Sequence, residues 1–350
     1  MVTITDIATK AGVSRATVSY VLNERNTTVR ISDHTRQRVM ETAAELGYRR
    51  NELARAVITG KNRMLGFWVM HSNREPVVRV LGGAMKEADS NDYFIKMLGL
   101  DNDTVDSRIV ERCIEWRLSG IIAIHAPAAA MDVLYPKVVD SGIPMVVVDS
   151  QRPPQGSTHV AANGAGGVRS VVEYLVKLGH RKIVFIAGEP DEDTISHTWA
   201  QAYLNTMQEL GLQRYQKVLH GYWLPEPTEH ITRTLLQQPT QVEERPTAIV
   251  CASDNMAMVV VRTAGQMSIR VPQELSVTGF DDSTVAALYN PPLTTVAQPF
   301  EEMGRLAVRS LLASTDVEQQ SELLEYSLEQ LPTQLVVRQS TAAPFTGPDK

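Results

Sequence analysis

The chain has 350 residues, of which 43% are hydrophobic and 21% are charged, and its formal net charge at pH 7 is −6. The composition is that of a globular protein with a buried core, and the length predicts two or three domains. These values exclude a disordered chain and a collagen-like repeat. Two cysteines, Cys113 and Cys251, are too few for a disulfide framework, so we expect both to be buried, reduced thiols.

The charge is distributed unevenly along the chain. Residues 1–63 contain eleven Lys and Arg against six Asp and Glu, a net charge of +5, so residues 64–350 carry a net −11. A short basic head on an acidic body indicates that nucleic acid is contacted by the head alone.

Three helices are predicted in the head. Thr3 and Asp6 fit a helix-start signal, and Ser14 and Ser32 stand where they can cap a second and a third helix. Gly12 breaks the first helix, and residues 23–31 form a polar loop. The first two helices and their short turn have the layout of a helix-turn-helix, although small helical domains with a basic face share this pattern.

The second helix of a helix-turn-helix enters the major groove of DNA. Its outward positions here are Arg15, Ala16 and Ser19, with Tyr20 beside them, and these side chains suit base edges. The short hydroxyl side chains suit phosphate contacts, and they are Ser14, Thr17 and Ser32.

The body alternates strands and helices in two series. The first series has strands at 65–70, 94–98, 120–124 and 144–149. The second has strands at 160–162, 182–187, 218–222, 248–251 and 275–279. Helical patterns separate them, which predicts two doubly wound α/β lobes with a cleft between the carboxyl ends of their strands.

Polar and aromatic residues follow several of these strands. Asp149, Ser253 and Asp281 stand at strand ends, where they could bind ligand hydroxyl groups, and Asp254 is expected to cap the next helix. Trp223 follows another strand and could stack on a ligand.

Enzyme motifs are missing from the sequence. The first strand is not followed by G-x-G-x-x-G, no phosphate-binding loop or G-x-S-x-G is present, and the histidines and cysteines lack metal-ligand spacing. We therefore expect no enzyme, no cofactor and no metal site.

The N-terminus lacks the features of a signal peptide, and no run of apolar residues is long enough to span a bilayer. We therefore expect a cytoplasmic protein without membrane contact.

Several segments, in this order along the chain, resemble the lactose-repressor (LacI/GalR) family of transcriptional regulators. They are residues 2–23, 30–57, 178–183, 272–282, 292–296 and 332–338. The resemblance implies an α/β architecture with an N-terminal three-helix helix-turn-helix head and a two-lobed body like that of periplasmic binding proteins. A solute-binding protein shares this body but would need an export signal and no basic head.

The resemblance also implies the domain limits. We expect a DNA-binding domain at 1–49, a hinge helix and linker at 50–63, an effector-binding and dimerisation domain at 64–340, and a tail at 341–350. Within the body, lobe 1 would comprise about 64–160 and 292–325, and lobe 2 about 161–291 and 326–340.

The family's hinge helix enters the minor groove with an apolar wedge, which falls here on Val57. The candidate DNA contacts are therefore Thr3, Ser14, Arg15, Ala16, Thr17, Ser19, Tyr20, Asn23, Ser32, Thr35, Asn51, Ala54, Arg55 and Val57. The expected partner is a palindromic operator in double-stranded DNA. We expect a homodimer to bind it, because the residues after Arg338 lack the heptad repeat of a tetramer-forming tail.

The expected effector is a sugar or sugar-like molecule that controls a repressor of carbohydrate-utilisation genes. Trp223 matches the family's stacking aromatic residue. Trp199 stands where the family commonly has an Arg, so the sugar would be more apolar or larger, or the chain no longer senses one. The candidate effector contacts are Asp149, Trp199, Trp223, Ser253 and Asp281.

Overall fold

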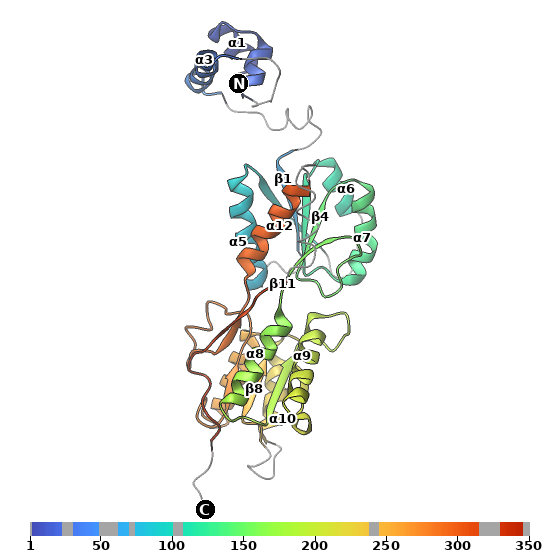
Figure 1. The fold of residues 1–350 in the computed structure, drawn as a ribbon, viewed down its shortest axis with the longest axis vertical. Coiled ribbons are helices and arrows are strands. Elements are labelled where there is room, and N and C mark those ends of the chain that lie inside the picture. Colours follow the sequence, from blue (N-terminus) through green and yellow to red (C-terminus); the bar gives the residue numbers. More distant parts are fainter. Residues whose placement is uncertain are drawn as a thin grey trace, which may run out of the picture. The chain divides into compact units, whose positions relative to one another are not determined.

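The computed structural model describes residues 2–22, 31–48, 62–69, 74–100, 108–237, 245–314 and 330–345. The chain divides into two compact units, one ending at Asn62 and the other beginning at Arg63 (Figure 1). Each unit is described by itself.

The first unit is a small helical domain. Its helices are α1 (Ile4–Ala11), α2 (Arg15–Leu22) and α3 (Asp33–Glu45). Thr3 and Asp6 form a reciprocal capping box at the start of α1, and Gly12 ends the helix with a left-handed φ of 64°. The fully buried Ile7, Val18 and Val39, one from each helix, meet in its core, so the predicted three-helix head is confirmed.

The first lobe of the second unit contains a six-stranded parallel sheet. From one edge to the other its strands are β11 (Gln330–Leu331), β5 (Thr158–Ala162), β4 (Met145–Val148), β3 (Gly120–Ile124), β1 (Met64–Val69) and β2 (Phe94–Gly99). One face packs on α5 (Glu75–Ser90) and α12 (Phe300–Ser314), and the other packs on α6 (Arg108–Glu115) and α7 (Ala128–Asp140).

The second lobe contains a four-stranded parallel sheet around one continuous core. Its strands, in spatial order, are β7 (Val218–His220), β6 (Ile183–Ala187), β8 (Ala248–Cys251) and β9 (Ser276–Thr278). Its helices are α8 (Gly164–Lys177), α9 (Ile195–Glu209), α10 (Pro225–Gln237) and α11 (Asp254–Gln266), with a short 3-10 turn, η1 (Gln213–Tyr215), after α9. Both lobes are doubly wound, as the sequence predicts.

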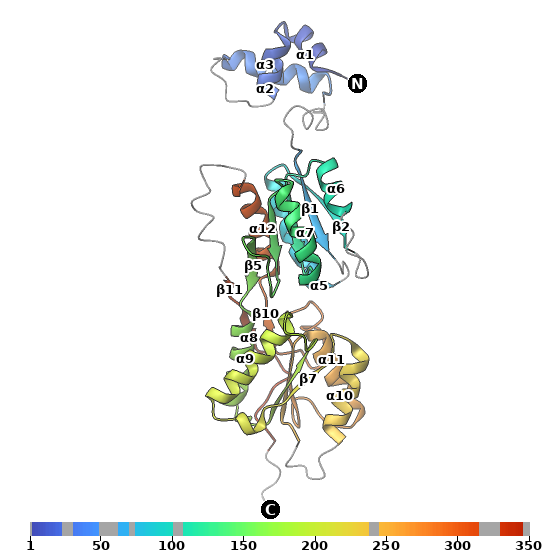
Figure 2. The same cartoon turned by 90° about the vertical axis from the view of Figure 1, so that its right-hand side faces the viewer.

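The chain passes between the lobes three times, close to β5, β10 (Thr295–Ala297) and β11 (Figure 2). Two crossings are joined because Asn163 N–H donates to the carbonyl of Leu331 at 2.8 Å and Thr333 Oγ1 donates to the carbonyl of Asn163 at 3.0 Å. The lobes are therefore linked by a narrow bundle of backbone that can act as a hinge.

The expected limits of the lobes need correction at two crossings. Residues 292–297 were expected in lobe 1, but Leu293 and Val296 lie in the lobe 2 core and β10 pairs with β12 (Gln334–Val336). Within residues 326–340, which were expected in lobe 2, β11 departs from the expectation because it pairs with β5 of the first sheet, whereas β12 lies in lobe 2. These strands are only two or three residues long, so periodicity could not place them. The expected hinge helix, including Asn51, Ala54, Arg55 and Val57, lies outside the described residues, as does Asn23.

Helices α5 and α12 approach each other unusually closely, and they run side by side in Figure 1. A Cβ on Gly83 would lie 1.9 Å from the carbonyl oxygen of Glu301, and a Cβ on Gly304 would lie 2.0 Å from the carbonyl oxygen of Val80. Backbone packs directly on backbone here, which only glycine allows at both positions.

We expect Gly83→Ala to lower the free energy of unfolding by about 1–3 kcal/mol, because the added methyl group forces the two helices apart. Gly82→Ala is the matched control, since a methyl group added at that position would meet no atom within 4 Å. Alanine there should raise stability by about 0.5–1 kcal/mol through its better helix propensity. Urea denaturation of both variants gives the comparison, and equal effects at positions 82 and 83 would contradict the close contact.

Candidate nucleic-acid interface and ligand cleft

The exposed side of α2 carries the candidate base contacts. Arg15 and Ala16 are exposed, whereas Thr17, Ser19 and Tyr20 are half-buried. The opposite side holds Val18, Val21 and Leu22 in the core, which fixes the helix so that Arg15 and Ala16 point away from the domain. Two of the predicted outward positions, Arg15 and Ala16, are therefore presented on a rigid element, whereas Ser19 is half-buried.

Hydroxyl groups stand at the N-termini of the three helices of the head. Ser14 Oγ accepts from Thr17 N–H at 3.0 Å, and Ser32 Oγ accepts from Thr35 N–H at 3.3 Å. Thr3 forms the cap of α1. A helix N-terminus with a hydroxyl group is a favourable place for a phosphate oxygen, because backbone N–H groups and the helix dipole both attract negative charge.

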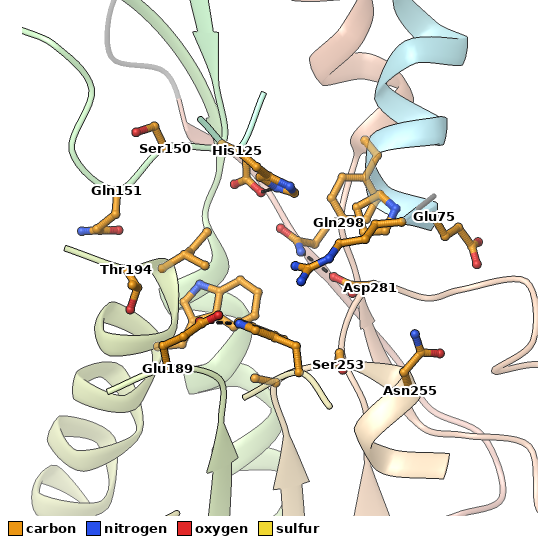
Figure 3. A pocket seen from close by; sticks show the side chains of 18 of the residues that line it. Glu75, His125, Ser150, Gln151, Glu189, Thr194, Ser253, Asn255, Asp281 and Gln298 are labelled. Atoms are coloured by element: carbon orange, nitrogen blue, oxygen red, sulfur yellow. Dashed lines mark hydrogen bonds and ion pairs between the residues drawn. The ribbon is translucent and has the colours of Figure 1, made fainter. Parts of the chain in front are cut away.

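A cleft of about 800 Å³ opens between the two lobes of the body. Its lining includes all five expected effector residues, Asp149, Trp199, Trp223, Ser253 and Asp281. In Figure 3, Ser150, Gln151 and Thr194 lie on one side of the cavity and Glu75 and Asn255 on the other. The cleft lies where the strands of both sheets end, as parallel α/β sheets require.

Asp149 faces His125 at the end of the neighbouring strand. His125 Nε2 lies 2.7 Å from Asp149 Oδ2, and both residues have left-handed backbone, with φ of 48° and 54°. Asp149 Oδ1 is buried and has no hydrogen-bond partner within the described residues. Burial lowers the pKa of the nearby His159, so this imidazole stays neutral and accepts from Ser150 N–H at 3.2 Å.

Two further carboxyl groups come from lobe 2. Asp254 is fully buried and accepts from Thr295 Oγ1 and from Ser283 N–H, each at 2.6 Å. Burial raises the pKa of Asp254 to about 6, although these hydrogen bonds oppose the shift. Asp281 Oδ1 accepts from Gln298 Nε2 at 2.7 Å (Figure 3). Burial, and then the charge of Asp254, raise the pKa of Asp281 well above its ordinary value.

The aromatic residues form a corner at the lobe 2 side of the cleft. Trp199 and Trp223 meet edge to face with ring centroids 6.3 Å apart, and Trp199 packs on Phe280 at 4.2 Å. Trp223 Nε1 donates to Glu189, which fixes the ring orientation. Trp199 exposes only 4% of its surface, so it supports the corner and offers a ligand little area of its own.

Polar contacts also join the lobes beside the cleft. Thr284 N–H in lobe 2 donates to Glu75 Oε1 of α5 at 2.9 Å. Arg152 contacts Asp132 of α7 at 2.6 Å and Asp193 of lobe 2 at 3.3 Å. These groups are exposed, so each contact contributes little, and the lobes can separate at small cost.

The structure changes the role of two predicted residues. Ser253, and not Asp254, caps α11, because Ser253 Oγ accepts from Met256 N–H at 3.3 Å. The side chain of Asp254 instead turns inward to Thr295 and Ser283. Both residues still line the cleft.

Several lining residues were missed by the sequence interpretation. His125 directly follows β3, and Glu189 follows β6 by one residue, so the rule that identified Asp149 would also have found them. Gln298 follows a three-residue strand without a visible pattern. Arg79 sits on α5 and donates to the carbonyl oxygens of Asp281 and Asp282 at 3.1 and 3.2 Å, a contact across the lobes that no local signal reveals.

Metal ligands and membrane spans are two further features that the fold could carry. Over the residues that the structure describes, no three His, Cys, Asp or Glu side chains gather as a metal site. None of the helices in those same ranges is both long and apolar enough to cross a membrane.

Family models match two parts of the chain. Residues 3–51 match "Bacterial regulatory proteins, lacI family", and residues 172–341 match "Periplasmic binding protein-like domain". An uncharacterised helix-turn-helix transcriptional regulator from the aml 5′ region of Streptomyces limosus is 32% identical over 97% of this chain and 94% of the relative. The transcriptional repressor PurR of Erwinia tasmaniensis is 31% identical over 98% of this chain and 97% of the relative.

Solved structures show the same architecture. The Lac repressor dimer bound to operator and the anti-inducer ONPF superimposes with a TM-score of 0.79 at 24% identity, covering 98% of this chain and 99% of that one. The complex of the regulator CelR with cellobiose gives a TM-score of 0.65 at 24% identity, covering 97% and 100%. These likenesses confirm the predicted fold class.

Asp254 should make stability depend on pH. In the folded protein the Asp254 carboxyl stays protonated up to about pH 6, whereas an aspartate in the unfolded chain loses its proton near pH 4. Ionising the buried group therefore opposes folding as the pH rises through this window. The free energy of unfolding of the wild type minus that of Asp254→Asn should therefore fall by about 1–3 kcal/mol between pH 4 and pH 7.

Urea denaturation at each pH unit measures this difference. Asp89→Asn, at an exposed site near the end of α5, is the control and should give a flat difference. A flat profile for Asp254→Asn as well would show that folding does not raise the pKa of Asp254 and would contradict the prediction.

Proposed function

Because the chain belongs to the LacI family of bacterial regulatory proteins, we propose that it is a repressor whose affinity for operator DNA is set by a small molecule in the cleft of its body. The observation that carries the proposal is the pairing of two sites in one chain. One is an outward helix face with Arg15 and Ala16, and the other is a polar and aromatic cleft between two hinged lobes.

The head reads DNA through α2 in the major groove. Arg15 is long enough for a bidentate contact to guanine, and the methyl group of Ala16 suits a thymine methyl. Ser14 and Ser32, already held at helix N-termini, position the domain on phosphates. Asn23, Asn51, Ala54, Arg55 and Val57 remain proposed contacts of the loop and hinge.

The cleft binds a sugar or a sugar-like molecule. Carboxylates at strand ends accept hydrogen bonds from hydroxyl groups, and Trp223 provides an apolar face for a ring. A cavity of about 800 Å³ is large enough for more than one sugar ring. Among the relatives, the ribose operon repressor of Haemophilus influenzae is 28% identical over 89% of this chain and 91% of the relative.

Control of DNA binding follows from the position of the cleft. A ligand that contacts both lobes favours one lobe arrangement over the other, and a difference in ligand affinity between the two arrangements is all that allostery requires. Glu75, His125 and Asp149 come from lobe 1, and Glu189, Trp223 and Asp281 come from lobe 2. The target genes are those for carbohydrate utilisation.

The protein acts as a homodimer on a palindromic site in the cytoplasm, where the DNA is, and it is not an enzyme. A two-fold protein requires two half-sites in opposite orientation. Its relatives are transcriptional regulators, which favours this assignment over a solute-binding protein with the same body.

Arg15→Ala should weaken binding to the specific operator by about 1–3 kcal/mol while leaving binding to random DNA nearly unchanged, because the lost contact is to a base edge. The operator is obtained first, by selecting genomic fragments that the full-length protein retains, and affinities are then compared by mobility shift at fixed salt. Equal losses of affinity for the operator and for random DNA would show that Arg15 contacts phosphate and not a base edge. Failure to enrich any two-fold site would contradict the function.

Trp223→Ala should reduce effector affinity at least tenfold and leave operator affinity without effector unchanged, because the indole lies in the cleft and not in the head. The readout is release of the selected operator during titration with a panel of mono- and disaccharides. Leu210→Ala, an exposed change at the far end of α9, should behave as the wild type. Equal release of the operator by both variants during the titration would show that Trp223 does not contribute to effector binding.

A further inference from the structure

We propose that the effector carries a protonated amino group, as an amino sugar does, and that the inner acidic part of the cleft formed by Asp149, Asp281 and Gln298 binds it. This inference rests on the function proposed above and specifies its ligand. It follows from which atoms lack partners, from the charge around them and from where the neighbouring cations are directed.

Of the three buried polar atoms in the lining of the cleft that lack partners among the described residues, two are hydrogen-bond acceptors only, and the third, Ser283 Oγ, can donate or accept. Asp149 is 8% exposed and Gln298 is 4% exposed, and Asp149 Oδ1 and Gln298 Oε1 are buried without a partner in the described parts of the chain. The amide group of Gln298 has a fixed orientation, because its Nε2 donates to the carboxylate of Asp281. Its oxygen must therefore be satisfied by a donor from outside the protein.

The side chains around these acceptors are acidic. The carboxyl groups of Asp149 and Asp254 both raise the pKa of Asp281 through space, so the three groups lie close enough to repel one another. A neutral His159 does not offset this charge. Glu189 and Glu75 are further acidic groups of the lining, engaged by Trp223 and Thr284.

The cations near this cluster offset its charge only in part. The charge of Arg79 lowers the pKa of Asp281, but its hydrogen bonds go to backbone carbonyls and it lies 5.3 Å from the centre of the Phe300 ring. His125 contacts only one oxygen of Asp149. Among the described residues, no Lys or Arg forms an ion pair with the carboxylates of Asp149, Asp254 or Asp281. The free protein thus holds an acidic site that its own cations compensate only in part, and a bound cation would favour the ionised form of Asp281.

An ammonium group matches this site better than a hydroxyl group. It has three donors, no acceptor and a positive charge, whereas each hydroxyl group brings one donor together with acceptor lone pairs. Hydrogen bonds between an ammonium and a carboxylate are also stronger than those between neutral groups. A phosphorylated sugar would be repelled, and the ring of an amino sugar can still pack on Trp223.

The test compares matched ligands by calorimetry at pH 7 with the full-length protein. The probes are glucosamine, galactosamine and mannosamine, each with its parent hexose and its N-acetyl derivative, which removes the charge but keeps the ring. At least one amino sugar should bind more than tenfold tighter than both counterparts and should alter operator binding. Equal or tighter binding of the parent, the N-acetyl form or a hexose phosphate overturns the inference, as does no binding by any amino sugar at millimolar concentration.

Neutralising one carboxylate should remove the preference. Asp281→Asn should reduce the ratio of amino sugar to parent sugar affinity at least tenfold, while Asp89→Asn leaves it unchanged. Without ligand, Asp281→Asn should not lower the midpoint of thermal unfolding, because it relieves repulsion from Asp254 and Asp149. An unchanged ratio in Asp281→Asn, or clear destabilisation of the free variant, contradicts the proposal.

The result also separates this inference from the proposed function. If a neutral sugar releases the operator and the amino sugars do not, the regulator is confirmed and only the ligand class is wrong. If no ligand in the panel changes binding to the selected operator, the ligand-controlled function itself is contradicted.

Discussion

All strands of a parallel sheet deliver their carboxyl ends to one edge, and this constraint organises the body of the protein. Three chain crossings bring these edges of the two sheets face to face, and a hydrogen bond from Asn163 N–H to the carbonyl of Leu331 joins two of the crossings. The cleft therefore collects side chains that are far apart in sequence, from Glu75 to Gln298. Its chemistry depends on residues directly after strands, and its width depends on a hinge of only a few backbone segments.

Much of this arrangement could be predicted from sequence because it follows from local patterns. Helix caps at Thr3 and Ser32 and the strand-end position of Asp149 are set by neighbouring residues. Other features depend on tertiary contacts that no local pattern records. Gln298 follows a very short strand, and the buried position of Asp254 requires Thr295 and Ser283 from distant segments. The same reason explains the misplaced limits of the lobes, because β10 and β11 are defined only by their partners.

The residues that line the cleft are held in an arrangement that lowers local stability. Several of its residues, including His125, Asp149 and Trp223, adopt left-handed backbone that is unfavourable for residues other than glycine. Carboxyl groups repel one another, and three buried polar atoms of the lining have no partner within the described residues. Extensive apolar cores in both lobes compensate for this locally unfavourable site. A ligand that satisfies these groups stabilises the arrangement of the lobes in which it is bound, which is the basis of a conformational response.

The direct backbone contact between Gly83 of α5 and Glu301 of α12 has a mechanical consequence for signal transmission. Glu75 and Arg79 lie on the first turns of α5, and Phe300 begins α12 immediately after the crossing that holds Gln298. Because no side chain separates the two helices at Gly83 and Gly304, sliding one past the other would bring backbone atoms into collision there. A ligand that displaces the crossing segment would therefore move both helices at once. The two helices would move along the face of the first sheet as one rigid body.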